Sequence, residues 1–537
     1  MTPSGLRGTM RPNHLLRRFM LLAIAVVTPL LAQTNSPANH LGQVDFPTSC
    51  LAAAQPMLEK GLALLHSFQY QEAQQTFAEA QSRDPKCAMA HWGSAMSLYH
   101  QLWDFPNDIK LKEGHAEIEK ARKLNPAGPK EQGFLIAAAA FYQDDSKLSH
   151  QDRTKAYSAA MAKFHDQMPA DVEVGSFYAL TLVALAEQDV DSLINQKQAI
   201  AILDPLFQKY PDHPGVAHYL IHAADRPELA PQGLAAARRY AQIAPDSPHA
   251  LHMPSHIFVR LGYWQDSVNS NIAADASARR LAEEHKAESH YQTHAMDYLN
   301  YSYLQSGQEA KAREVIAAAD HVIGASHERK DDYRIYLSSR TAIELHRWKD
   351  AAALEEPKVS ADKLDTVRWA KSIGAARSGD VAAAQANVKA LADSVAAREA
   401  QARKDGYPPP KEKATDLREA EAWLAYAKGQ TEQALDELRA AAAYEERNGG
   451  ESTFMPAREM LADMLADLKR SSDALLEYQT VLKNAPNRFD ALLGGARAAQ
   501  ASGNATTAQT FYAQLAESCP AGDRPELLEA KTYLAKK

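Results

Sequence analysis

The sequence predicts an all-α protein, a solenoid of about twelve helix-turn-helix repeats. Three observations lead to this prediction. The chain has 537 residues, which is too long for one ordinary hydrophobic core. Alanine is abundant and the strand-forming residues Val, Ile and Thr are sparse, which favours helix over sheet. A short pattern of glycine, small and apolar residues recurs along the chain, as it does in repeat proteins.

The first 32 residues have the three parts of an export signal. A positively charged N-terminal region is followed by the short apolar run FMLLAIAVV. Small residues then precede a predicted cleavage site after Ala32. The run is too short for a typical membrane span, so an uncleaved membrane anchor is the less favoured alternative. We expect an exported chain, periplasmic or secreted, with no stable membrane insertion after the signal is removed. The positive residues are Arg7, Arg11, Arg17 and Arg18.

Charge and cysteine content narrow the classes further. The chain carries 59 Lys and Arg against 67 Asp and Glu, which argues against a nucleic-acid partner because such binding needs a basic face. Export permits disulfides, and two of the three cysteines, Cys50 and Cys87, flank the first predicted helical pair. We expect these two to form a disulfide and Cys519 to be buried. Three free buried thiols are the alternative.

The recurring pattern is typical of a helical hairpin. A glycine permits the tight turn between two helices, and a small residue five positions later lets the helices approach closely. An apolar residue four positions further lies on the same helical face and fills the interface, and a proline often closes the unit. Copies occur at Gly262, Ser267, Asn271; Gly307, Ala312, Ile316; Gly379, Ala384, Val388; Gly429, Ala434, Leu438; and Gly503, Ala508, Tyr512.

This pattern resembles the tetratricopeptide repeat, which has a period of about 34 residues. The clearest copies are 54–87, 248–281, 293–326, 415–448, 455–488 and 489–522. The segments GLALLHSFQYQEA (61–73) and DPKCAMAHWGSAMSLYHQLW (84–103) also resemble a subgroup of exported bacterial tetratricopeptide proteins. The resemblance implies a right-handed superhelical solenoid, in which the first helix of each pair lines a concave groove where partners bind. We divide the chain into a signal peptide (1–32), an extension (33–53), an array with a histidine-rich groove (54–401), a proline-rich linker or loop (402–416) and C-terminal repeats with a capping helix (417–537).

Histidines cluster in the middle of the array. Nine of the 20 histidines lie between residues 213 and 294. His218 and His222 are four residues apart, as are His252 and His256, and this spacing places each pair on one helical face. The second pair follows the first by 34 residues, so both pairs occupy the same step of neighbouring repeats. The spacing therefore predicts a two-by-two array of imidazoles on adjacent first helices.

Neighbouring polar residues extend this predicted groove. His249 lies one turn before His252, and Asp225 follows His222 on the same face. Alignment of the next unit matches His294 to His249 and places Asp297 and Tyr301 at the positions of the second pair. Tyr333, Tyr336 and Arg340 fall at groove positions of the following unit. Pro254 breaks a backbone hydrogen bond inside the helix and predicts a kink there.

Three hypotheses follow. The leading one is an exported scaffold that binds a peptide or protein partner through its groove. The second is a metal-binding solenoid or metalloenzyme, in which His218, His222, His252 and His256 hold Zn, Cu or Fe and Asp225 or Asp297 is a ligand or general base. The third is a structural spacer. A peptide-binding groove predicts histidines that are spread along its surface. A metal site predicts histidines that converge on one point, and a spacer predicts histidines that are buried. The chain contains no phosphate loop, dinucleotide fingerprint or nucleophile elbow, so a non-enzymatic role is favoured.

Overall fold

A computed structural model describes residues 40–143, 148–186, 192–285, 288–404, 412–450 and 453–536. In these segments the regular structure consists of helices, with no strand. The predicted signal peptide, residues 33–39 of the extension and residues 405–411 of the linker lie outside them. The helices are α1 Gln55–His66, α2 Tyr70–Arg83, α3 Ala88–Met96, α4 Asp108–Leu124, α5 Pro129–Phe141, α6 His150–Gln167, α7 Val172–Ala186, α8 Ile194–Lys209, α9 Pro214–Ala224, α10 Ala230–Ile243, α11 Pro248–His252, α12 Pro254–Arg260, α13 Trp264–His285, α14 His290–Gln305, α15 Glu309–Ala318, the 3-10 helix η1 Ala319–His321, α16 His327–Glu344, α17 Trp348–Ala352, α18 Ala361–Arg377, α19 Val381–Lys404, α20 Thr415–Ala427, α21 Thr431–Asn448, α22 Ala457–Asp467, α23 Ser471–Asn484, α24 Phe489–Ala501, α25 Ala505–Ser518 and α26 Glu526–Ala535.

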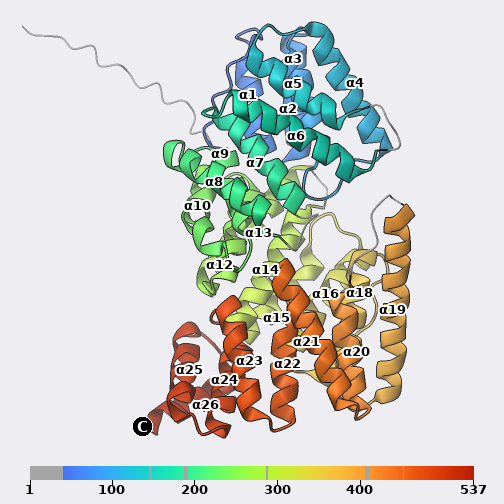
Figure 1. Cartoon of the computed structure of the whole chain (residues 1–537), viewed down its shortest axis with the longest axis vertical. Helices are drawn as coiled ribbons and strands as arrows, with labels where there is room; N and C mark the ends of the chain where they lie inside the picture. The colour runs from blue at the N-terminus through green and yellow to red at the C-terminus, as the bar shows by residue number, and fades with distance from the viewer. Residues whose placement is uncertain are drawn as a thin grey trace, which may run out of the picture. The chain divides into compact units, whose positions relative to one another are not determined.

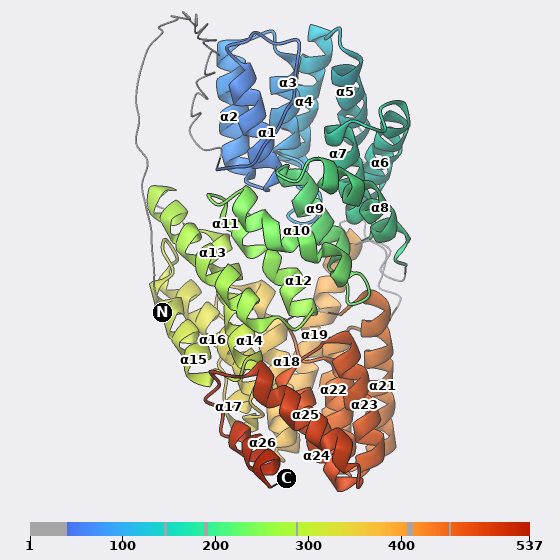
Figure 2. The same cartoon turned by 90° about the vertical axis from the view of Figure 1, so that its left-hand side faces the viewer.

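Successive helices pack as hairpins, which confirms the predicted all-α repeat fold (Figures 1 and 2). The turns follow the glycine rule. Gly262 and Gly307 adopt φ of +68° and +70°, a region that side chains with a Cβ rarely enter. The small residues Ser267 and Ala312, five positions later, are fully buried at 0% exposure where the paired helices meet. The tetratricopeptide-like pattern therefore describes the local packing correctly.

The array also makes contacts between units that are far apart in sequence. In a simple solenoid each repeat contacts only its neighbours. Here α24 packs against α14, and residues 486 and 487 meet the turn at Gly262. A Cβ at Gly262 would lie 2.1 Å from the Pro486 carbonyl oxygen, and the Trp264 indole donates to the Asn487 carbonyl at 2.8 Å. Contacts thus join the parts of the chain before and after the predicted linker, and the residues that the structure describes belong to one compact unit.

A buried arginine stabilises the packing of α24 against α14. Arg488 lies at the start of α24 and is 0% exposed. Its guanidinium donates to Glu344 at 2.8 Å, to the Tyr301 hydroxyl at 2.8 Å and to Glu459. These partners belong to α16, α14 and α22, so one side chain connects four helices. Buried ion pairs hold their geometry because a lost partner leaves an uncompensated charge.

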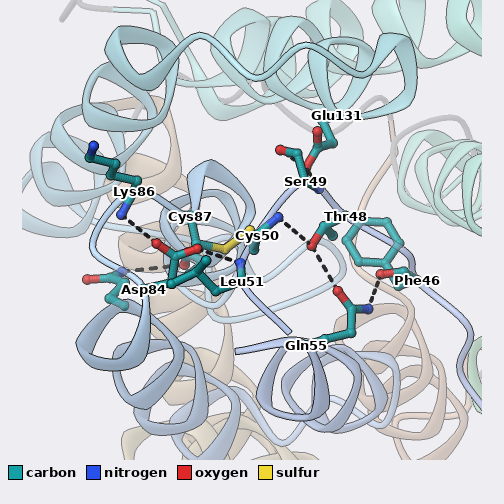
Figure 3. The surroundings of a disulfide bond; sticks show 12 residues. Phe46, Thr48, Ser49, Cys50, Leu51, Gln55, Asp84, Lys86, Cys87 and Glu131 are labelled. Atoms are coloured by element: carbon teal, nitrogen blue, oxygen red, sulfur yellow. Dashed lines mark hydrogen bonds between the residues drawn. A yellow bond between two sulfur atoms is a disulfide. The ribbon is translucent and has the colours of Figure 1, made fainter. Parts of the chain in front are cut away.

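The structure places a disulfide between Cys50 and Cys87, the pair that the sequence favours (Figure 3). It ties the segment before α1 to the residue before α3. Leu51 N–H donates to the Asp84 carboxylate at 2.7 Å beside it. Cys519 is free and buried, and burial raises the pKa of its thiol to about 12. Among the residues described, no helix is both long and apolar enough to cross a membrane.

Candidate metal centre

Four helices from three successive hairpins carry the clustered histidines. His218 and His222 lie on α9, and His249 and His252 lie on α11. The predicted break at Pro254 is present, because α11 ends at His252 and α12 starts at Pro254. His256 therefore stands on a separate short helix, while His294 lies on the first turns of α14.

The histidines converge in two groups of three rather than in the predicted two-by-two array. We call His218, His222 and His249 the first triad, and His252, His256 and His294 the second triad. Within each triad, one ligating nitrogen of every ring lies within 4.8 Å of the others. The Nε2 atom of His218 is 3.0 Å from that of His249 and 3.1 Å from that of His222. The two pairs of the sequence pattern thus belong to different triads.

The outer nitrogens of three rings are held by hydrogen-bond acceptors. His218 Nδ1 donates to the His66 carbonyl at 2.6 Å. His252 Nδ1 donates to Asn271 Oδ1 at 2.7 Å, and His256 Nδ1 donates to Asp225 Oδ2 at 2.8 Å. A ring that donates from Nδ1 in its neutral form carries its lone pair on Nε2. Ring orientation by such partners is the usual support of histidine metal ligands.

This assignment has a direct consequence for His252 and His256. Their Nε2 atoms lie 3.0 Å apart, and when both rings are neutral both atoms carry lone pairs, because both Nδ1–H groups are already donated. Two facing lone pairs repel unless a positive charge lies between them. A proton can join only two nitrogens, whereas a metal ion joins all three of a triad. Nitrogens that bind one ion at 2.0–2.1 Å lie about 2.9 to 3.4 Å apart for ligand angles between 90° and tetrahedral.

Burial keeps five of the triad imidazoles in the neutral form that binds metals. His218, His249 and His252 are 0%, 4% and 2% exposed. Burial, followed by the neighbouring histidines, holds the pKa of each of these three rings well below its usual value. The same causes lower the pKa of His222 to about 3 and that of His294 to about 4. No proton therefore competes strongly for these five rings at neutral pH.

A phenylalanine from the first hairpin packs over the first triad. Phe68 follows α1 with φ of +54°, and its ring centroid lies 4.4 Å from His218, 5.7 Å from His222 and 5.6 Å from His249. The Tyr291 hydroxyl donates to the Phe68 carbonyl at 3.0 Å. An apolar ring on one side of the imidazoles excludes water there and restricts their movement.

A fully buried carboxylate supports the same region. Glu173 on α7 is 0% exposed and accepts hydrogen bonds from His66 Nε2 at 2.8 Å and His213 Nε2 at 3.0 Å. His66 Nδ1 accepts from the Tyr219 hydroxyl at 2.9 Å. Both nitrogens of His66 are thus occupied, and its role is to hold the carbonyl that orients His218. We interpret this cluster as part of the support for the first triad.

Both triads open onto one cavity of 780 Å³. Its wall includes His222 and His249 of the first triad and His256 and His294 of the second. A second cavity of 780 Å³ shares several of its lining residues. The shared residues are His222, Asp225, Arg260, Tyr336 and Lys363.

The two predicted groove aspartates, Asp225 and Asp297, line the cavity, and each is bonded to an arginine. The Asp225 carboxylate accepts hydrogen bonds from His256 Nδ1 at 2.8 Å and from Arg260 Nε at 3.0 Å. Burial alone raises the pKa of this carboxyl, but the Arg260 and His256 contacts hold it below its usual range. Asp297 also lines the cavity, and Arg340 binds its carboxylate and its carbonyl.

Tyr301 requires a correction. Its hydroxyl hydrogen-bonds to Arg488 and its ring packs against Trp264, so it does not join the histidines. Tyr298 takes the place beside the second triad, with its ring centroid 4.7 Å from His252 and 4.8 Å from His256. Tyr298 is four residues after His294 and shares its helical face, a relation within one helix that a comparison of equivalent positions in neighbouring repeats does not contain. The supporting roles of Asn271, Phe68 and His66 are likewise not predicted by the sequence pattern.

The comparisons with known proteins concern the overall architecture. The sequence matches no protein-family model and no curated protein. A structure of the human IFIT1 dimer with PPP-AAAA is similar at 12% identity and a TM-score of 0.36, over 88% of this chain and 92% of that chain. Yeast Tom70 is similar at 12% identity and a TM-score of 0.33, over 90% of this chain and 95% of that chain. Likeness at this level carries no argument about what this chain does.

Proposed function

We propose that this chain is a metal-binding helical-repeat protein whose histidine triads hold transition-metal ions at the wall of a cavity. One observation carries the proposal. The Nε2 atoms of His252 and His256 face each other at 3.0 Å, while Asn271 and Asp225 accept from their outer nitrogens, so in the neutral rings two lone pairs face each other. His294 supplies the third nitrogen within the same 4.8 Å limit. A bound cation removes the repulsion and uses all three lone pairs.

This arrangement fits the metal hypothesis better than its competitors. A groove for a peptide or protein partner requires histidines that are spread along a surface, and these rings converge instead. A structural spacer requires histidines whose ring nitrogens all have protein partners, as His66 has. The second triad differs from His66 because the neutral rings of His252 and His256 direct lone pairs toward each other. The peptide-scaffold hypothesis is therefore the less supported one.

The donor set indicates which metal is held. Both triads consist of neutral imidazoles only, and imidazole suits Zn, Cu and Fe. Copper(II) binds such nitrogen sites more tightly than the other divalent first-row ions. Three protein ligands leave a coordination position open, as in catalytic rather than structural sites. The cavity gives a small molecule access to that position.

We also propose that the chain is exported. The sequence pattern of residues 1–32 supports this, and so does the Cys50–Cys87 disulfide, because disulfides persist in oxidising compartments.

The deciding experiment is a metal analysis of the exported protein, purified without a histidine tag and then exposed to Cu(II) or Zn(II). We expect tightly held metal in the unsubstituted protein. The double variant His252→Ala/His256→Ala loses the metal of the second triad, whereas His290→Ala keeps it. His290 is the matched control because it lines the same cavity but belongs to neither triad. A protein that takes up neither ion would refute the proposal.

A further inference from the structure

We further propose that the two triads form one dinuclear centre, in which two copper ions share a small anionic ligand drawn from the cavity. This inference rests on the proposed function and adds the number of ions, their coupling and the class of exogenous ligand.

The spacing of the rings supports a single centre. Within the triads, the ring centroids of His222 and His249 are 6.2 Å apart, and those of His256 and His294 are 6.1 Å apart. Between the triads, His222 lies 6.3 Å from His256, and His249 lies 6.4 Å from His252. These spacings between the triads therefore exceed the longest spacing inside a triad, 6.2 Å, by at most 0.2 Å. Ions held by the two sets of nitrogens are immediate neighbours.

The chain connectivity fixes the two triads to each other. His249 and His252 are three residues apart on α11, yet each belongs to a different triad. Side chains at this spacing share one helical face, so the triads cannot separate without unfolding α11. Asp225 follows directly after α9, which carries the first-triad residues His218 and His222, and it orients His256 of the second triad. The link through Asp225 makes the orientation of one triad depend on the helix of the other.

The cavity offers one ligand access to both ions. It is lined by two histidines from each triad, so a small molecule inside it meets both metal positions. The triads provide no negative charge to two Cu(II) ions. Asp225 is already bonded to His256 and Arg260, and Asp297 to Arg340. An exogenous anion such as hydroxide or azide compensates the metal charge and bridges the pair, as ligands do in two-metal sites with ions about 3.5–4 Å apart.

Electron paramagnetic resonance of the Cu(II)-loaded protein tests this inference. We expect two Cu(II) per chain and a signal far weaker than two isolated spins give, because a one-atom bridge couples the spins. Azide titration changes the absorption of the pair with one azide per two copper ions. The variants His249→Ala and His294→Ala, one per triad, each keep one Cu(II) and regain its full signal. His290→Ala behaves like the unsubstituted protein.

The outcomes separate the two proposals. Absence of bound copper overturns the proposed function itself. Two bound copper ions with the full signal of two spins leave metal binding intact and overturn the dinuclear centre, as does a single copper ion per unsubstituted chain. Circular dichroism melts of the two triad variants identify any loss that comes from unfolding. The unsubstituted protein decides the question even if both variants fail to fold.

Discussion

Asn271 gives a sharp test of how the second triad is built. It lies on α13, is 0% exposed and touches His252 from the side away from the ligating nitrogen. Its Oδ1 accepts from His252 Nδ1 at 2.7 Å, and its Nδ2 donates to the Ser267 carbonyl at 2.9 Å. The substitution Asn271→Leu removes the acceptor while filling most of the volume. His252 is 2% exposed, so water cannot easily replace the lost partner.

The expected loss follows from the tautomer. Without an acceptor at Nδ1, the His252 proton moves to Nε2 in a large fraction of molecules, and that form cannot bind the ion. Loss of such outer partners typically lowers metal affinity about 10- to 100-fold, or about 1.4 to 2.7 kcal/mol. Asn271→Asp keeps an acceptor and should keep the affinity. Chelator competition measures both variants, with circular dichroism as the folding control. An affinity of Asn271→Leu within twofold of the unsubstituted protein would show that the tautomer assignment is wrong.

Four other expectations concern stability. In metal-free protein, burial lowers the pKa of His222 to about 3, so between that value and about 6.5 the unfolded state binds more protons than the folded state. The free energy of unfolding should therefore fall as the pH drops through this range, by up to about 1.4 kcal/mol per pH unit for this ring. Urea unfolding at pH 7 and pH 5 measures the difference. Arg488→Met should cost about 3–5 kcal/mol in urea unfolding because it leaves buried carboxylates unpaired, whereas the half-exposed Arg497→Met should cost about 1 kcal/mol or less. Reduction of the Cys50–Cys87 disulfide should cost about 4 kcal/mol in the chain-entropy model, measurable as a lower denaturation midpoint with reductant. Metal at 100 times its dissociation constant should stabilise the fold by about 2.7 kcal/mol per site, and an unchanged melting temperature contradicts specific binding.

The repeats were predictable because their signals are local. Each hairpin needs a residue that tolerates positive φ and a small residue where the helices meet, and Gly262 with Ser267 meets both needs. The histidines were predictable as a group for the same reason, since spacing of four residues fixes a helical face. Their division into triads was not, because it depends on the break at Pro254 and on how α11, α12 and α14 pack.

The unusual position of Asn271 is visible in the sequence itself. The fourth residue after the small position is apolar or aromatic in the other glycine-bearing copies, as Ile316 and Leu438 illustrate, and only the unit that carries His252 has an amide there. A polar side chain in a slot that packing reserves for apolar residues has to have a partner. That partner is His252. No local sequence pattern indicates the role of Phe68, because its contact with His218 joins hairpins separated by about 150 residues.

The long-range contacts explain how a repeat array can hold such a site. Metal ligands must keep their positions within about 0.5 Å, whereas neighbouring repeats of an open solenoid can shift against each other. Here Phe68 braces the first triad from one end of the array, and Arg488 fixes α14, the helix of His294, to the C-terminal repeats. Histidines that would line a flexible groove in an open array are thereby held on both sides. We infer that these closing contacts convert a polar face of the repeats into a metal centre, and that their loss should weaken metal binding even where every ligand remains.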